Sequence, residues 1–202
     1  MTARANREDW GPVAKILHWA MAVGITVMFV CGIAMAWSLN GNVGLKFSVY
    51  QFHKSLGLAL LCVALLRLIR RIGSADRPDP ADQPKSFERG LAKVVHIGLY
   101  VCLIAQPLIG WAAVSASPLN IPTVIFGLFA VPPLGHADAD LEKLLNTAHG
   151  LVACALLALL MLHGAAALWH HFVVRDETLL RMLPRSWWGA RLTSTTSDRH
   201  PS

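Results

Sequence analysis

The chain has 202 residues, of which 54% are hydrophobic and 15% are charged, and its formal net charge is +6. Soluble domains carry about 25% charged residues, so this composition excludes an ordinary soluble fold and indicates that lipid is the main solvent. The positive charges lie in loops and tails between apolar runs, which excludes a nucleic-acid partner and fits a membrane surface. The length allows a single domain, residues 1–202.

Four apolar segments follow one another, each close to the roughly 20 residues that a helix needs to cross a bilayer. They are residues 13–37, 49–69, 91–114 and 144–172. The first ends in "AMAWS", which resembles a signal-peptidase site, but its apolar run is longer than that of a signal peptide, so we expect a retained span. Residues 121–135 are apolar but short and bounded by prolines, and we expect an interfacial or lid segment there rather than a fifth span.

Lysine and arginine are distributed unevenly over the links between these segments, with 15 on one side and 3 on the other. The side with few positive residues holds only Lys46, Lys54 and Lys143. Cytoplasmic loops of membrane proteins carry the excess of positive charge, so both termini are expected in the cytoplasm and residues 173–202 form a cytoplasmic tail. The predicted fold is an all-α integral membrane four-helix bundle.

Four histidines lie near the ends of the predicted spans. With the termini inside, His18 and His163 fall near the cytoplasmic face, whereas His53 and His149 fall near the outer face. His149 and His163 are 14 residues apart, nearly four helical turns, so they project from much the same face about 21 Å apart. Two depth-matched pairs of imidazoles on different helices are therefore expected, one at each face.

A pair of imidazoles from two helices can hold a planar macrocycle from opposite sides through its iron, which gives each buried polar ring a metal partner. The pattern favours two haems bound by the pairs His18/His163 and His53/His149. Small residues after these positions, among them Gly57, Gly150 and Gly164, suit a porphyrin but also suit plain helix packing. No C-x-x-C-H motif is present, so attachment is non-covalent. A proton relay, a transition-metal site or transporter, and structural packing remain open alternatives.

Two further histidines, His96 and His170, lie at the cytoplasmic level. They could be solvated interfacial residues, and the competing interpretation is that their imidazoles donate a hydrogen bond to a quinone carbonyl. No role is assigned to His136, His171 or His200.

The motifs "KILHW" opening the first span, "FHKSLG" opening the second, and "AHG" followed by "LHGAAALWHHFVVRDETLLRMLP" closely resemble the bacterial four-helix cytochrome b561 family. The likeness runs from about Lys15 to Pro184. It implies a dihaem b-type cytochrome of the bacterial inner membrane linked to ubiquinone, with a characterised member that is a superoxide oxidase. The family's ligand positions match His18, His53, His149 and His163, and its histidines in the third helix and after the last ligand match His96 and His170.

The resemblance implies an enzyme that passes electrons from a periplasmic one-electron donor, superoxide in the characterised member, to ubiquinone in the membrane. Lys46, Lys54 and Lys143 are candidates for guiding the donor. The rivals are a haem-bearing anchor that relays electrons for a separate dehydrogenase or hydrogenase, and a haem-free proton or metal transporter. No Ser-His-Asp arrangement, phosphate-binding loop or dinucleotide fingerprint is present, and no catalytic side chain is assigned.

Overall fold

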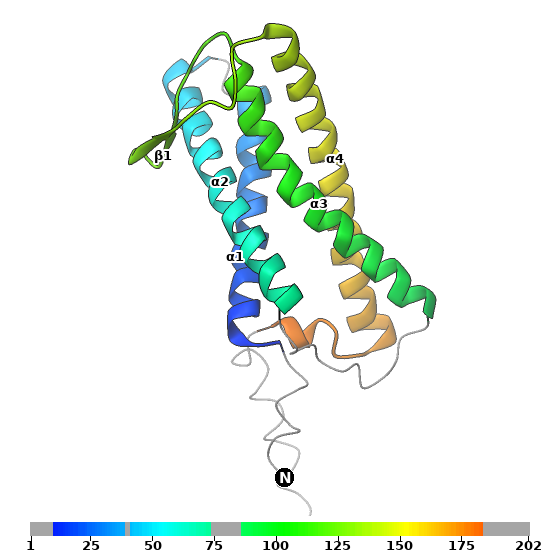
Figure 1. The fold of residues 1–202 in the computed structure, drawn as a ribbon. Coiled ribbons are helices and arrows are strands. Elements are labelled where there is room, and N and C mark those ends of the chain that lie inside the picture. The colour runs from blue at the N-terminus through cyan, green and yellow to red at the C-terminus, as the bar shows by residue number, and fades with distance from the viewer. Residues whose placement is uncertain (1–9, 39–40, 74–85, 184–202) are drawn as a thin grey trace, which may run out of the picture.

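Four long helices follow one another in the computed structural model, which describes residues 10–38, 41–73 and 86–183. They are α1 (Pro12–Ile33), α2 (Val43–Gly73), α3 (Ser86–Ala116) and α4 (Ala139–Trp169). π-Helical turns extend α1 and α4, and these are η1 (Ala34–Ser38) and η2 (His170–Val174). The "AMAWS" stretch is thus continuous with the first helix. The chain runs up and down, and neighbouring helices in sequence pack side by side (Figure 1).

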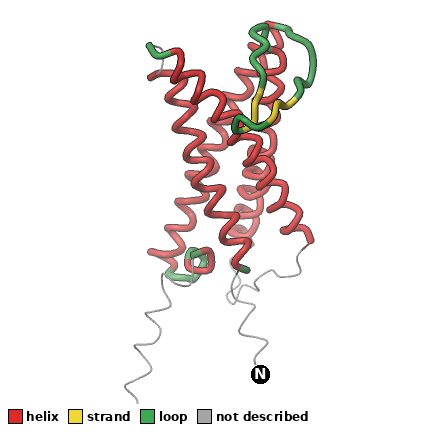
Figure 2. The backbone as a smooth tube through the Cα atoms, turned by 90° about the vertical axis from the view of Figure 1, so that its left-hand side faces the viewer, coloured by secondary structure: helices red, strands yellow, loops and turns green. Residues whose placement is uncertain are grey.

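The bundle has two different ends. The start of α1 and the last described residues lie at one end, which we call the tail end (Figure 1). The starts of α2 and α4 lie at the opposite end (Figure 1) together with a β-hairpin (Figure 2), and we call this the hairpin end. Most of the predicted N-terminal arm and C-terminal tail falls outside the described residues.

Three of the helices are long and apolar enough to cross a membrane, over Pro12–Trp37, Phe87–Ala116 and Ala139–Val174. α2 has the same length as α3 and α4, 31 residues. A helix of that length extends about 46 Å, more than the roughly 30 Å of the hydrocarbon core. The helices therefore begin and end beyond the predicted apolar segments, because their polar ends stay helical in the headgroup region.

Few apolar side chains are buried between the helices. Two small clusters form the core, one around Met21, Ile25 and Ala64 and the other around Val95, Leu99 and Leu156. Large apolar side chains instead cover the outside, and examples at mid-helix are Val23, Val30, Leu151 and Met161, each more than 60% exposed. Exposed apolar surface on this scale fits a lipid-facing bundle.

The link between α3 and α4 folds into a two-stranded antiparallel hairpin of β1 (Thr123–Ile125) and β2 (Phe129–Val131). Gly127 in its turn has φ +77°, a left-handed conformation that glycine adopts without a steric penalty. β1 packs on α2. The apolar residues 121–135 are thus no fifth span but a hairpin against the side of the bundle.

Candidate functional site

His53 and His149 lie at the same height near the hairpin end. Each follows the first residue of its helix by ten positions, and both α2 and α4 begin at that end. Equal numbers of residues along two such helices bring the side chains to equal depth, about 15 Å from the helix starts. The two imidazole rings face each other with centroids 6.4 Å apart and planes at 64°.

In each ring of this pair, one nitrogen has no partner within the described structure. Nδ1 of His53 and Nδ1 of His149 are both buried and have no hydrogen-bond partner in the described structure. A buried polar atom without a partner is costly, so the pair is a site that needs a further group.

Gly110 of α3 makes room for the His149 ring. A Cβ atom at Gly110 would lie 3.1 Å from Cε1 and 3.3 Å from Nδ1 of His149, closer than ordinary van der Waals contact. Of the glycines that follow the histidines in sequence, Gly57 packs against Met28, whereas Gly150 and Gly164 face open space. The sequence pattern therefore missed the glycine nearest to a ring, because that glycine belongs to another helix.

His18 and His163 form the corresponding pair near the tail end. His18 follows the first residue of α1 by six positions, and His163 precedes the last residue of α4 by six, so they too share a height. Their ring centroids are 6.2 Å apart, with planes at 63°. His96 of α3 lies against the same group, with its ring centroid 5.2 Å from that of His163. Sequence reasoning placed His96 at this level but not beside His163.

The separations within the two pairs fit imidazoles that share one metal ion. Bonds from a metal to imidazole nitrogen are about 2 Å long, so two rings on opposite sides of one ion have centres about 6 Å apart. Each pair of imidazoles would supply two nitrogen ligands to a haem iron, whose other four nitrogens would come from the porphyrin. In residues 10–38, 41–73 and 86–183, no group of three or more His, Cys, Asp or Glu side chains is placed to hold a metal ion. The donor sets thus fit haem iron.

Arg67 and Tyr100 also belong to the tail-end group, and the sequence analysis did not single them out for this role. Nη2 of Arg67 lies 3.1 Å from Nδ1 of His18, and the Tyr100 hydroxyl bonds with the same guanidinium. Arg71 lies over the Tyr100 ring, with its guanidinium carbon 5.8 Å from the ring centroid. The arginine pattern of the sequence predicts only the orientation of the chain, because it does not show which side chains meet in space.

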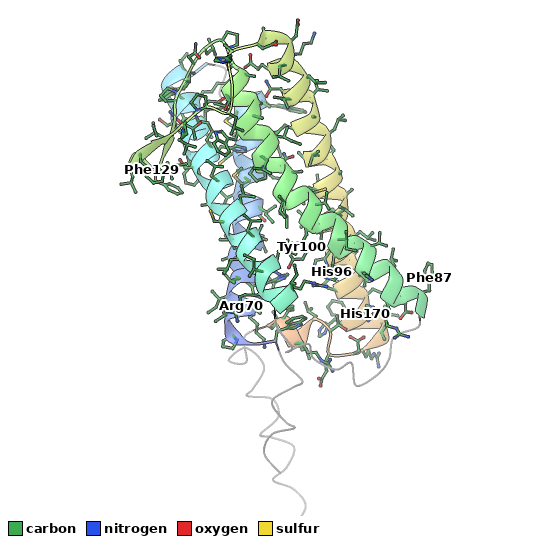
Figure 3. The ribbon with its side chains drawn as sticks, in the orientation of Figure 1. Arg70, Phe87, His96, Tyr100, Phe129 and His170 are labelled. Atoms are coloured by element: carbon green, nitrogen blue, oxygen red, sulfur yellow. The ribbon has the colours of Figure 1, made fainter. Side chains whose placement is uncertain are left out.

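His170 is held by the segment that follows α4. Its Nδ1 donates a hydrogen bond to Asp176 at 2.6 Å. Partial burial raises the pKa of Asp176, but hydrogen bonds from Thr178 and His170 outweigh this and lower the pKa below its ordinary value. The segment then returns to α1, where Lys15 donates to the Leu183 carbonyl at 3.0 Å. We call residues 175–183 the strap. Figure 3 shows His170 in the tail half of the bundle, as it does His96 and Tyr100.

The three candidate lysines lie at the hairpin end but on different elements. Lys54, next to His53, donates to the Pro122 carbonyl at 2.9 Å and lies over the Tyr50 ring at 4.7 Å. Lys46 is in the first turn of α2. Lys143 lines a shallow surface pocket formed by the first turns of α4.

The acidic residues near Lys143 have a structural role in starting α4. The Asp138 carboxylate caps the helix by accepting hydrogen bonds from the backbone N–H groups of Asp140 and Leu141. Asp140 and Glu142 lie in the first turn, where negative charge is favourable beside the positive end of the helix dipole.

Comparison with known proteins gives the same picture as the geometry. Residues 9–185 match the family model of prokaryotic cytochrome b561. "Cytochrome b561 homolog 2" of Escherichia coli (strain K12) is 31% identical over 180 residues, covering 89% of this chain and 93% of that protein. "Probable superoxide oxidase CybB" of Yersinia pestis is 32% identical over 170 residues, covering 82% and 94%.

A matching family model over most of the chain and relatives above 30% identity settle the family. The helical bundle, the apolar exterior and the half-buried histidines are what such a protein needs to carry electrons within a lipid bilayer. The chain therefore belongs to the prokaryotic cytochrome b561 family of b-type haem-binding membrane electron-transfer proteins.

Proposed function

We propose that the chain holds two b haems, one by His53 and His149 and one by His18 and His163. The observation that supports this most strongly is the presence of two ring pairs, at 6.4 and 6.2 Å, near opposite ends of one bundle. When bound, the haems supply the one-electron redox chemistry, and the chain's part is to place them, exclude water and tune their potentials. Two haems also match a two-electron acceptor fed by a one-electron donor.

The proposed orientation places the tail end in the cytoplasm of a bacterium and the hairpin end outside the inner membrane. The arginines and lysines of the described chain support this, since the tail end carries most of them and cytoplasmic ends carry the excess of positive charge. The positive residues at the tail end are Lys15, Arg67, Arg70, Arg71, Arg89, Lys93, Arg175 and Arg181.

The proposed donor is superoxide, which reaches the His53/His149 site from outside. The name of the Yersinia pestis relative supports this choice. Lys54 supports it as well, because it places a cation next to His53, and positive potential attracts a small anion. Of the nearby acidic residues, Asp138 is engaged as the cap of α4.

The proposed acceptor is ubiquinone, bound near the tail end by His96 and His170. Nδ1 of His96 is bonded to the Ala92 carbonyl at 2.6 Å, and Nδ1 of His170 is bonded to Asp176. In both rings this leaves Nε2 as the nitrogen that can contact a quinone oxygen. The arrangement supports a headgroup site beside the His18/His163 pair.

Haem stoichiometry and a purified two-substrate assay test the proposal. The chain is purified in nanodiscs, its haem is counted, and enzymatically generated superoxide is supplied with a soluble ubiquinone analogue. We expect two haems per chain and quinone reduction without any other subunit. His149→Ala should leave one haem, and His136→Ala, in the exposed link before α4, is the control. His96→Ala should slow quinone reduction while keeping both haems.

Two results would contradict this proposal. Two haems retained in His149→Ala would exclude the pairing. Quinone reduction that requires a co-purifying dehydrogenase or hydrogenase would instead make the chain a haem-bearing relay subunit.

A further inference from the structure

Arg67 is a partly buried cation near the tail end of α2, and its hydrogen bonds all go to uncharged groups. Its side chain crosses from α2 to α1, where Nη2 lies 3.1 Å from Nδ1 of His18 and Nη1 lies 3.5 Å from the Leu17 carbonyl. Tyr100 of α3 adds its hydroxyl. Figure 3 shows Tyr100 and His96 on α3, with Arg70 nearby at the end of α2.

No carboxylate lies within ion-pair distance of Arg67 in the part of the chain that the structure describes. The acidic side chains of the strap are used elsewhere, since Asp176 pairs with His170 and Glu177 lies 3.9 Å from Arg181. A partly buried guanidinium without a counter-charge is costly in a low-dielectric surrounding. This position is therefore suited to an anionic group that the protein itself does not provide.

The contact between Arg67 and His18 cannot persist once His18 binds iron. A guanidinium only donates hydrogen bonds, so Nδ1 of His18 must be the acceptor. If a neutral His18 binds iron through Nε2, Nδ1 carries the proton and cannot accept; if it binds through Nδ1, that lone pair is used by the metal. In both cases the guanidinium loses its hydrogen bond to His18 when haem is bound.

We propose that Arg67 then binds a propionate carboxylate of the haem held by His18 and His163, with Tyr100 as a second donor. A haem b carries two propionates, and a guanidinium matches a carboxylate in charge and in the spacing of its donors. Arg67 is thus a positioning and tuning residue of the tail-end site. Its charge also favours the reduced iron, because reduction removes one positive charge nearby.

A redox titration of purified variants tests this inference, which depends on the proposed tail-end haem but not on the donor or the quinone. In Arg67→Gln we expect the midpoint potential of one haem to fall and that of the other to stay. Arg67→Lys should restore most of the potential. Arg70→Gln removes the same charge from an exposed position three residues away on the same helix and should leave both potentials nearly unchanged.

Haem dimethyl ester, in which both propionates are esterified, tests the carboxylate itself. Reconstituted with this ester, the wild-type chain should release the tail-end haem faster than it releases native haem, whereas Arg67→Gln should release the two at nearly the same rate. Equal release of the ester and of native haem by the wild-type chain, or equal potentials of the wild-type chain and Arg67→Gln with native haem, would overturn the inference.

If the Arg67→Gln variant does not assemble, the wild-type chain alone can still test whether Arg67 binds a propionate. The ester should then dissociate from the tail-end site faster than native haem, and equal rates would count against Arg67. Absence of any b-type spectrum in the wild-type chain would remove the proposed function instead.

Discussion

The four paired histidines show how a residue's place in its helix decides its partner. His53 and His149 meet because each lies ten residues into a helix that begins at the hairpin end, and His18 and His163 meet because each lies six residues from the tail end. The depth of each histidine follows from its residue number within the helix. The facing of the rings, at about 6 Å, comes from the way the helices pack.

Gly110 offers a direct test of this packing at the hairpin-end site. In Gly110→Ala the new methyl group would meet the His149 ring at 3.1–3.3 Å, so the ring has to shift by a few tenths of an ångström. We expect a shifted potential and a lower occupancy for one haem only, measured by redox titration and haem assay. Gly150→Ala, where nothing lies within 4 Å, is the matched control. Identical behaviour of the two variants would show that the ring has room to spare.

Among the elements, the β-hairpin is held on α2 in part by one buried hydroxyl. Ser55, 1% exposed, lies two residues after His53. Its Oγ is 2.9 Å from the Gln51 carbonyl and 3.1 Å from the Val124 carbonyl, and it accepts a hydrogen bond from the N–H of Phe126 at 3.0 Å. The hairpin and the helix that carries His53 thus share a polar contact.

Replacing Ser55 should release the hairpin. Ser55→Ala leaves the Phe126 N–H without its acceptor, which costs about 1–3 kcal/mol for a buried group. We expect faster hydrogen exchange at residues 123–131 with both haems retained. Ser48→Ala, whose exposed hydroxyl bonds only the Gly44 carbonyl one turn back, is the control. Equal exchange in both variants would mean that other contacts hold the hairpin.

The strap depends on ionised Asp176. Its pKa is lowered in the fold, so the stabilisation that it contributes is complete above the ordinary aspartate range near pH 4 and is lost as the pH falls through the lowered value. Asp176→Asn should increase hydrogen exchange in residues 175–183 at neutral pH, whereas Glu177→Gln, a more exposed neighbour, should not. A strap that exchanges alike in all three proteins would show that its bonds to α1 suffice.

The sequence predicts the helices and the heights of the histidines because both follow from apolar run length and residue count. It does not predict the hairpin, since strands of three residues are too short to show a periodic pattern. It also cannot place His96 against His163 or Gly110 against His149, because these contacts depend on how α3 is rotated about its own axis.

At the scale of the whole molecule, charge is distributed unevenly between the two ends of the bundle. Positive side chains gather at the tail end, whereas the hairpin end combines three lysines with the acidic start of α4. The two histidine pairs lie one near each end, about 21 Å apart along α4. An electron that enters at one pair and leaves at the other therefore crosses much of the membrane, and the direction of that crossing depends on the orientation of the chain.

Reporter fusions decide that orientation. Positive charge at the tail end predicts that green fluorescent protein fused after Ser202 is fluorescent and that alkaline phosphatase at the same point is inactive. Alkaline phosphatase inserted in the exposed turn at Gly127 should be active if the hairpin end faces the periplasm, as proposed. The reverse pattern would place the His18/His163 pair outside, where it would meet the external donor first, and electrons from that donor would then travel toward the hairpin end rather than away from it.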